Sequence, residues 1–226
     1  MILLEWLKEI LFPRKCVLCQ VILKKDESDL CHDCRCDSPE WFDSGRKLPN
    51  FHGIAAVWFY EDQVRDSLHR YKFSGKRHYA GTYGRLLAMI VRREFPELDL
   101  ITWVPVSRKR KWSRGYDQAE LLAKALSREL GIPAVPTLKK IRDNPAQSGI
   151  SDPARRLANV RGVYRRKGDC DLSNRKILLV DDILTTGATA CSCAEVLKTS
   201  EDMELYLAVV AAGRTKRQKQ NNSAPV

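Results

Sequence analysis

The sequence predicts an α/β fold, a parallel sheet flanked by helices, with a small metal-binding module in front of it. Two observations predict this fold. Short continuous apolar runs alternate with helical patterns along the chain, and two Cys-x-x-Cys pairs precede them. A chain of 226 residues, 44% of them hydrophobic, has room for one full domain and a small appendage. We therefore expect a module over residues 1–48, a main domain over 49–214 and a basic tail over 215–226.

The clearest strand comprises residues 177–180, where four apolar residues stand in a row. A short apolar run bounded by polar residues is typical of a strand buried on both faces, as in a parallel sheet. Asp181 and Asp182 follow it directly. Because open α/β sheets bind ligands at the carboxyl ends of their strands, we expect these two carboxylates to face a ligand.

A turn rich in hydroxyl groups comes next and opens a helix that runs to about residue 198. It comprises Thr185, Thr186, Gly187, Ala188 and Thr189. Gly187 has no Cβ, so the backbone can approach a ligand closely there. Backbone N–H groups at the start of a helix, together with the hydroxyls, bind anions. A helix cap alone needs fewer such residues, so the segment indicates a sugar-phosphate site.

Two other phosphate-binding classes are excluded. A phospho-acceptor receiver domain also starts with an apolar strand and an acidic pair, but it needs roughly 100 further residues of sheet and helix. Only 44 residues follow Asp182. Residues 72–77, KFSGKR, lack the earlier glycine and the final Ser/Thr of a Walker A loop.

Four of the eight cysteines form an ordered set: Cys16, Cys19, Cys31 and Cys34. Each Cys-x-x-Cys pair can turn two thiolates toward one metal ion, and two such pairs complete a tetrahedral zinc site. His32 and Cys36 are alternative ligands, and redox-active cysteines are the main rival interpretation. Four protein ligands leave no open position, so we expect zinc to stabilise a segment too small to hold a core of its own.

The rest of the chain supplies the other expected elements. An apolar stripe at helical spacing runs through residues 2–11 and ends before Pro13. Further on we expect strands at 54–60 and 100–106, helices at 62–71, 81–94 and 119–130, and a basic loop at 107–118.

The net charge of +11 favours polyanionic partners, which include nucleic acid and small polyphosphates. The basic loop follows a strand, so Arg108 and Lys109 are candidates for binding a pyrophosphate. Residues 138–163 are polar and long for a loop, which is typical of a lid. Its Arg142, Arg155 and Arg156 would add positive charge over a reacting polyphosphate.

Residues 177–189, ILLVDDILTTGAT, resemble the phosphoribosyl-pyrophosphate (PRPP) motif of type I phosphoribosyltransferases. The resemblance implies the fold of those enzymes and a PRPP ligand that arrives with Mg²⁺. It also implies that Asp181 and Asp182 hold the ribose 2′- and 3′-hydroxyls. The turn at residues 185–189 would hold the 5′-phosphate.

The chain as a whole resembles the ComF family, in which a zinc finger precedes a phosphoribosyltransferase-like domain. The matching segments, in order, are FPRKCVLC with the second Cys-x-x-Cys, LHRYKFSGKR, VPVSRKRKWSRGYDQAELLAKAL, a spaced series from Arg142 to Val160, and the PRPP motif. The resemblance implies a role in DNA uptake during natural competence, with single-stranded DNA and proteins of the competence machinery as partners.

Two functions are consistent with these features. In the first, ribose C1 loses pyrophosphate and a nitrogen nucleophile attacks it, with positioning and charge stabilisation as the main catalytic effects. In the second, the same fold binds single-stranded DNA or senses PRPP without turnover, with Trp112 and Tyr116 either stacking on bases or packing against the sheet. No apolar run reaches the ~18–20 residues of a membrane span, and residues 1–12 lack the basic start of a signal peptide, so we expect a cytoplasmic protein.

Overall fold

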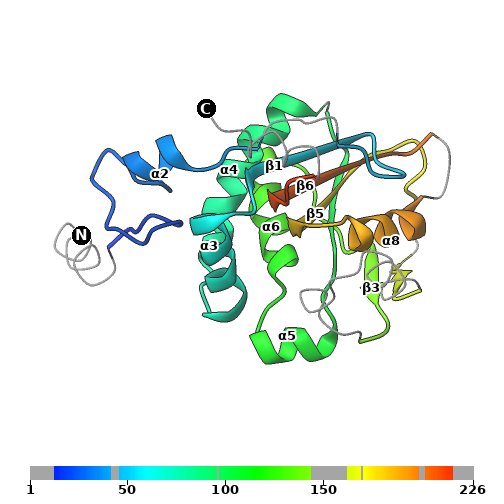
Figure 1. Cartoon of the computed structure of the whole chain (residues 1–226). Coiled ribbons are helices and arrows are strands. Elements are labelled where there is room, and N and C mark those ends of the chain that lie inside the picture. The colour runs from blue at the N-terminus through cyan, green and yellow to red at the C-terminus, as the bar shows by residue number, and fades with distance from the viewer. Residues whose placement is uncertain are drawn as a thin grey trace, which may run out of the picture.

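The main domain is built on a four-stranded parallel sheet (Figure 1). The computed structural model describes residues 13–41, 46–95, 97–143, 162–168, 170–198 and 202–215. The strand order is β1-β6-β5-β2, and every neighbouring pair is parallel. The strands are β1 (Gly53–Phe59), β2 (Leu100–Trp103), β5 (Lys176–Leu184) and β6 (Glu204–Ala212). This is the parallel α/β architecture that the apolar runs predict.

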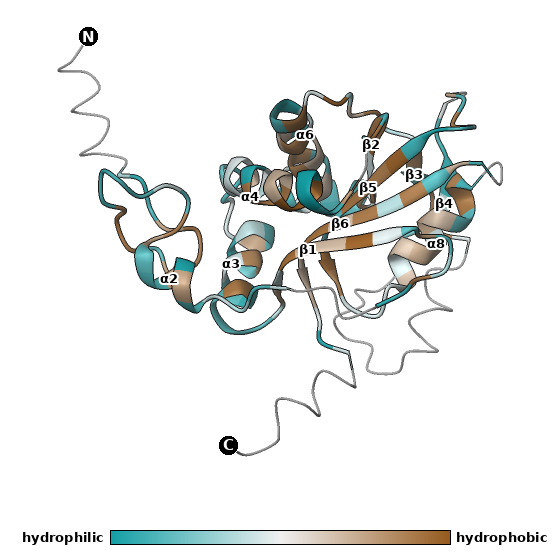
Figure 2. Cartoon of the chain, turned by 90° about the horizontal axis from the view of Figure 1, so that it is seen from above, coloured by the Kyte–Doolittle hydropathy of each residue, from teal (hydrophilic) through white to brown (hydrophobic). Residues whose placement is uncertain are grey.

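Helices cover both faces of the sheet, as Figures 1 and 2 show. Leu178 and Val180 pack with α3, α4 and α6, whereas their neighbours Ile177 and Leu179 pack with α8 on the opposite face. Successive residues of a strand point to opposite faces, so a run that is apolar at every position requires a cover on each side. The helices are α3 (Asp62–Phe73), α4 (Tyr79–Glu94), α6 (Gln118–Leu130) and α8 (Ala188–Leu197).

Strand β6 is the central strand that our sequence interpretation missed. It lies between β1 and β5 and pairs with both. Its sequence, ELYLAVVAA, is a continuous apolar run, and eight of its nine residues are buried. The same pattern that identified residues 177–180 as a strand was therefore present here as well.

Two predicted boundaries differ from the structure. Strand β5 continues to Leu184, so Asp181 and Asp182 lie within the carboxyl-terminal half of the strand. Asp181 is still paired with Val209 of β6. The expected basic loop instead contains a helix, α5 (Arg108–Arg114). Ser107 caps α5 by accepting from the backbone N–H of Arg110 at 3.3 Å, and Gly115 ends it with φ of 77°.

The expected lid, residues 138–163, begins with a strand, β3 (Leu138–Lys140), which pairs antiparallel with β4 (Tyr164–Arg166) just beyond the end of that segment. Arg142 follows β3 and is exposed. Arg155 and Arg156 lie outside the described residues, as do the apolar stripe of residues 2–11 and residues 216–226 of the expected tail. Among the helices that the structure describes, none combines the length and the apolar character needed to cross a membrane.

Candidate functional site

Two carboxylates lie near the carboxyl end of β5, and we call Asp181 and Asp182 the acid pair. Asp182 is buried, and its Oδ2 forms an ion pair with Lys72 Nζ of α3 at 2.9 Å. Asp181 is half-buried, and its Oδ1 accepts from the backbone N–H of Asp182 at 2.8 Å. Burial, together with the neighbouring Asp182 charge, raises the pKa of Asp181 to about 8. A cationic ligand at this site would favour ionisation of Asp181.

Residues 185–189, the threonine loop, turn the chain from β5 into α8. Gly187 precedes α8 with φ of 88°, a left-handed conformation that residues with a Cβ rarely adopt. The Thr186 hydroxyl accepts from the backbone N–H of Ala188 at 3.4 Å. A pocket here is lined by Asp181, Thr185, Gly187, Ala188 and Thr189, together with apolar residues of β5 and β6.

Arg46 fixes the base of the threonine loop. Its guanidinium donates to the carbonyl of Thr185 and, at 3.0 Å, to the carbonyl of Gly213 beyond β6. Leu48 lies against Gly187, where an added Cβ would come within 2.6 Å of its side chain. Two residues at the end of the predicted module, residues 1–48, thus contact the threonine loop of the main domain.

Lys72 is the site residue that sequence reasoning missed. It lies in the segment LHRYKFSGKR, which matches the ComF pattern and lacks the features of a Walker A loop, but no site role was assigned to its lysine. Its ion pair with Asp182 joins residues 110 positions apart, so no local spacing pattern could have revealed it. The one available signal was a lysine at the end of a helix beside the sheet.

The basic helix α5 contains the predicted Arg108 and Lys109, both exposed, and a further cation, Arg114. The charge of Asp182 acts on Arg114, whose pKa is lowered by burial, and the Arg114 guanidinium stacks over the Phe73 ring at 4.7 Å. From β3, Lys140 adds a further cation, which lies 5.6 Å from the centre of the Tyr164 ring. Burial, with repulsion from Arg110, lowers the pKa of Lys140 to about 8.

The two aromatic residues of this region have different roles. Trp112 on α5 is 93% exposed. Tyr116 is buried, donates its hydroxyl to the carbonyl of Tyr71 and carries the Arg77 guanidinium over its ring at 5.0 Å. The sequence left open whether these aromatic residues stack on bases or pack inside the protein. Trp112 is exposed and free to stack on a partner, whereas Tyr116 packs inside the protein.

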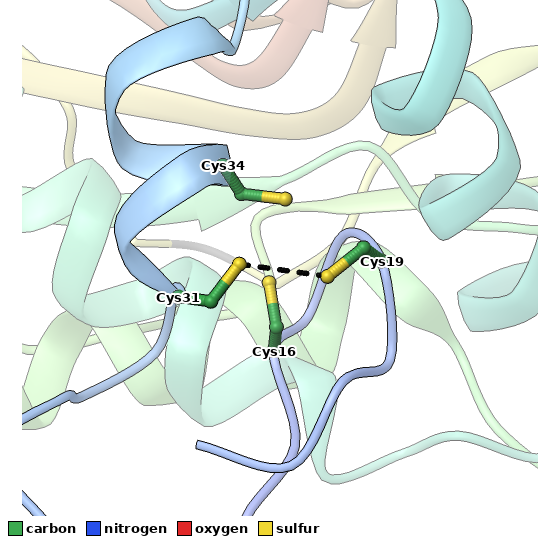
Figure 3. Close-up of side chains that lie close together, drawn as sticks. All are labelled: Cys16, Cys19, Cys31 and Cys34. Atoms are coloured by element: carbon green, nitrogen blue, oxygen red, sulfur yellow. Dashed lines mark hydrogen bonds between the residues drawn. The ribbon is translucent and has the colours of Figure 1, made fainter. Parts of the chain in front are cut away.

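The four predicted cysteines come together at the amino-terminal end of the described chain (Figure 3). Their sulfur atoms all lie within 4.8 Å of one another, and the Cys19 and Cys31 sulfurs are 3.5 Å apart. A zinc tetrahedron with Zn–S bonds of about 2.3 Å has sulfur–sulfur edges of about 3.8 Å, so the cluster is compatible with structural zinc. All four cysteines are free thiols rather than disulfides.

Local backbone geometry explains how the cysteines converge. Cys16 and Cys19 lie on a turn in which Gln20, with φ of 70°, reverses the chain and donates its backbone N–H to the Cys16 carbonyl at 3.0 Å. Cys31 and Cys34 lie at the start of α2 (His32–Asp37). The alternative ligands form a separate contact, with Cys36 Sγ 3.8 Å from His32 Nε2, and both residues are exposed. Among the described residues, the metal-ligand cluster contains only the four cysteines.

Comparisons with known proteins found one matching family model, sequence relatives and solved structures that resemble this chain. A family model described as the phosphoribosyl transferase domain matches residues 117–225. Competence protein F of Haemophilus influenzae is 31% identical over 161 residues, which cover 68% of this chain and 69% of that protein. DNA utilization protein YhgH of Salmonella typhi is 27% identical over 209 residues, which cover 82% and 91%. The solved glutamine PRPP amidotransferase from B. subtilis, complexed with ADP and GMP, is 20% identical with a TM-score of 0.40. That match covers 59% of this chain and spans only 26% of that enzyme.

The parallel sheet, its helical layers and the family match define a phosphoribosyltransferase-like α/β protein. Its amino-terminal cysteine cluster is an addition to that class. On the similarity to Competence protein F, the chain belongs to the ComF family.

Proposed function

We propose that this protein binds PRPP with Mg²⁺ at the acid pair and the threonine loop, and acts in DNA uptake. The observation that carries the proposal is the geometry of β5, where two carboxylates precede a left-handed Gly187 and the start of α8. Carboxylates accept hydrogen bonds from ribose hydroxyls, and the N–H groups at the start of α8 suit a terminal phosphate. The role in DNA uptake rests on the names of the relatives, a competence protein and a DNA utilization protein.

The reaction that such a site would support is phosphoribosyl transfer. The C1–O bond to pyrophosphate breaks, pyrophosphate leaves with the electron pair, and the lone pair of a nitrogen nucleophile forms the new bond to C1. The proton of that nitrogen passes to solvent or a base. Lys72, Arg114 and Lys140 supply positive charge around the acid pair, where the leaving pyrophosphate needs it.

Calorimetric titration of the protein with PRPP and Mg²⁺ tests the binding proposal. We expect saturable binding by the wild type and a loss of at least tenfold in affinity when Asp181 and Asp182 are both changed to Asn. Asp66→Asn, a change of an exposed aspartate on α3, is the matched control and should bind as the wild type does. Equal PRPP affinity in the double variant and the control would refute the assignment. Release of pyrophosphate in the presence of candidate bases then decides between turnover and binding alone.

Single-stranded DNA binding is the second candidate function, and the exposure of Trp112 favours it. A tryptophan that is 93% exposed on a helix of sequence RKRKWSR combines a stacking surface with phosphate-binding cations. Fluorescence anisotropy with a labelled oligonucleotide should show binding that weakens steeply with salt. The absence of binding at low salt would exclude this function, whatever the outcome with PRPP.

We also propose that Cys16, Cys19, Cys31 and Cys34 hold one structural zinc ion. Burial raises the pKa of the Cys34 thiol, and a bound cation would stabilise the thiolate in place of the proton. Elemental analysis of the purified protein should give one zinc per chain. A content well below that value would contradict the proposal.

A further inference from the structure

The cysteine module, residues 13–37, is attached to one face of α3. Gln63, Ser67 and Arg70 are spaced i, i+4 and i+7, so they share that face. Cys34 Sγ lies 3.2 Å from Gln63 Oε1, and the Ser67 hydroxyl donates to the Val17 carbonyl. The Arg70 guanidinium donates to the carbonyls of Val17 and Leu18.

These contacts hold the turn that carries the first two cysteines. Val17 lies between Cys16 and Cys19, and both Val17 and Leu18 are 2% exposed in the core shared with α3. The carbonyls of this turn accept from the buried Ser67 hydroxyl and from one Nη atom of the half-buried Arg70 guanidinium, and groups removed from water need such partners. The position of the turn and the position of α3 therefore depend on each other.

The carboxyl-terminal end of α3 reaches the acid pair. Lys72 follows Arg70 by two residues and pairs with Asp182 at 2.9 Å. Between them, Tyr71 is fully buried and donates its hydroxyl to the Gln118 carbonyl at 2.8 Å. The backbone at Tyr71 is held as well, because its carbonyl accepts from the Tyr116 hydroxyl.

We propose that the cysteine module positions Lys72 through α3, and that Arg70 and Ser67 are positioning residues for the acid pair. The ligand role of that pair rests on the proposed function, but the mechanical link does not. The metal would act at a distance by fixing the turn at Val17. Arg70 and Ser67 would pass that constraint to the helix, and Lys72 would deliver a positive charge to Asp182.

The titration of the acid pair measures this link, because Lys72 lowers the pKa of Asp181 against the effect of burial. Other ionisable groups also interact with the pair, and all of them except Tyr71 belong to elements other than α3. They are Tyr71 on α3, Tyr83 on α4, Arg114 on α5, Asp117 before α6, Lys140 on β3, Tyr164 on β4 and Cys193 on α8.

The experiment is a carboxyl titration by NMR of the zinc-loaded protein labelled with ¹³C at aspartate, without PRPP. The Asp181 signal is assigned by its loss in Asp181→Asn. Lys72→Met should raise its midpoint by about one pH unit, since a nearby opposite charge lowers a carboxyl pKa by about 1–3 units. Arg70→Met should raise it in the same direction by a measurable part of that shift, and Arg70→Lys should restore part of the wild-type value.

Arg85→Met is the matched control. Arg85 on α4 pairs with Asp29, with Nε 3.0 Å from Oδ2, so it ties the same module to a different helix. We expect this variant to titrate as the wild type does. If Arg70→Met folds poorly, Ser67→Ala removes one contact of the same turn and should move the midpoint upward as well.

A wild-type midpoint in Arg70→Met and Ser67→Ala, beside a shifted Lys72→Met, would overturn the proposal. An equal shift in Arg85→Met would also overturn it, because general loosening would then explain the effect. A failure of wild-type protein to bind PRPP would refute the proposed function alone, since the titration needs no ligand.

Discussion

Replacing Asp181 by Asn should make the unliganded protein more stable at pH 8.5 while it weakens ligand binding. Burial beside Asp182 raises the pKa of Asp181 from 3.8 to about 8. Ionisation of this carboxyl is therefore opposed in the folded protein and unopposed in the unfolded chain. Asn keeps the shape of the side chain, and its carbonyl can still accept from the backbone N–H of Asp182.

The expected gain follows from the size of the shift. A rise of about 4 units, at 1.36 kcal/mol per unit, sets an upper limit of about 6 kcal/mol. Asp181 is only half-buried and Lys72 shares the charge of the pair, so we expect a gain of about 1–3 kcal/mol. The neighbouring change Asp182→Asn has the opposite sign. It leaves the Lys72 ammonium, 21% exposed, without its anion and should destabilise by about 1–3 kcal/mol.

Urea unfolding at several pH values measures both effects. The contribution of Asp181 is fully present below about pH 4 and is lost as the pH rises through about 8, because its folded pKa is the higher one. The wild type should therefore lose stability over this window relative to Asp181→Asn, and the two should converge near pH 4. A variant that is less stable than the wild type at pH 8.5 would refute the reasoning.

Three further predictions concern other parts of the molecule. Cys34→Ser should lower zinc content and the melting temperature together, as elemental analysis and calorimetry would show; a full zinc complement would contradict the ligand set. Gly187→Ala should destabilise by about 1–2 kcal/mol and weaken PRPP binding, because φ is 88° and Leu48 lies close. Gly131 has φ of 73° and open space around it, so Gly131→Ala should destabilise the fold by a similar amount and leave PRPP binding unchanged. Equal losses of PRPP affinity in the two variants would count against a role of the threonine loop in binding. Trp112→Ala should weaken oligonucleotide binding by at least about 1 kcal/mol without changing stability, and unchanged anisotropy would remove Trp112 from any DNA surface.

The parts of the fold that were predictable are those whose signal is local. The run at residues 177–180 is apolar at each position because both faces of β5 are covered, so its pattern already implied a parallel sheet with two helical layers. The paired Cys-x-x-Cys spacing likewise brings two sulfurs together within each turn. Strand β6 carries the same kind of local signal, a run of buried apolar residues, so it too is predictable from the sequence.

The basic segment at residues 107–118 shows where local interpretation went wrong. Its charge suggested a loop, yet Ser107 supplies a cap, Gly115 supplies a left-handed stop, and the seven residues between them form α5. A short helix gains much of its stability from the surroundings, here the stacking of Arg114 on Phe73 and the ion pair of Lys111 with Glu120. Neither partner lies within the segment.

The sequence by itself determined the chemistry of the two candidate sites: four thiols at metal-ligand spacing, and an acidic pair followed by a hydroxyl-rich turn. Both depend on residues a few positions apart, whose relative placement follows from backbone geometry. Only the tertiary structure decided what surrounds them. It placed Lys72 on Asp182, Arg46 on the threonine loop and the turn at Val17 on α3. These contacts arise from the packing of helices on the sheet, and contacts between distant segments leave no periodic trace in the chain.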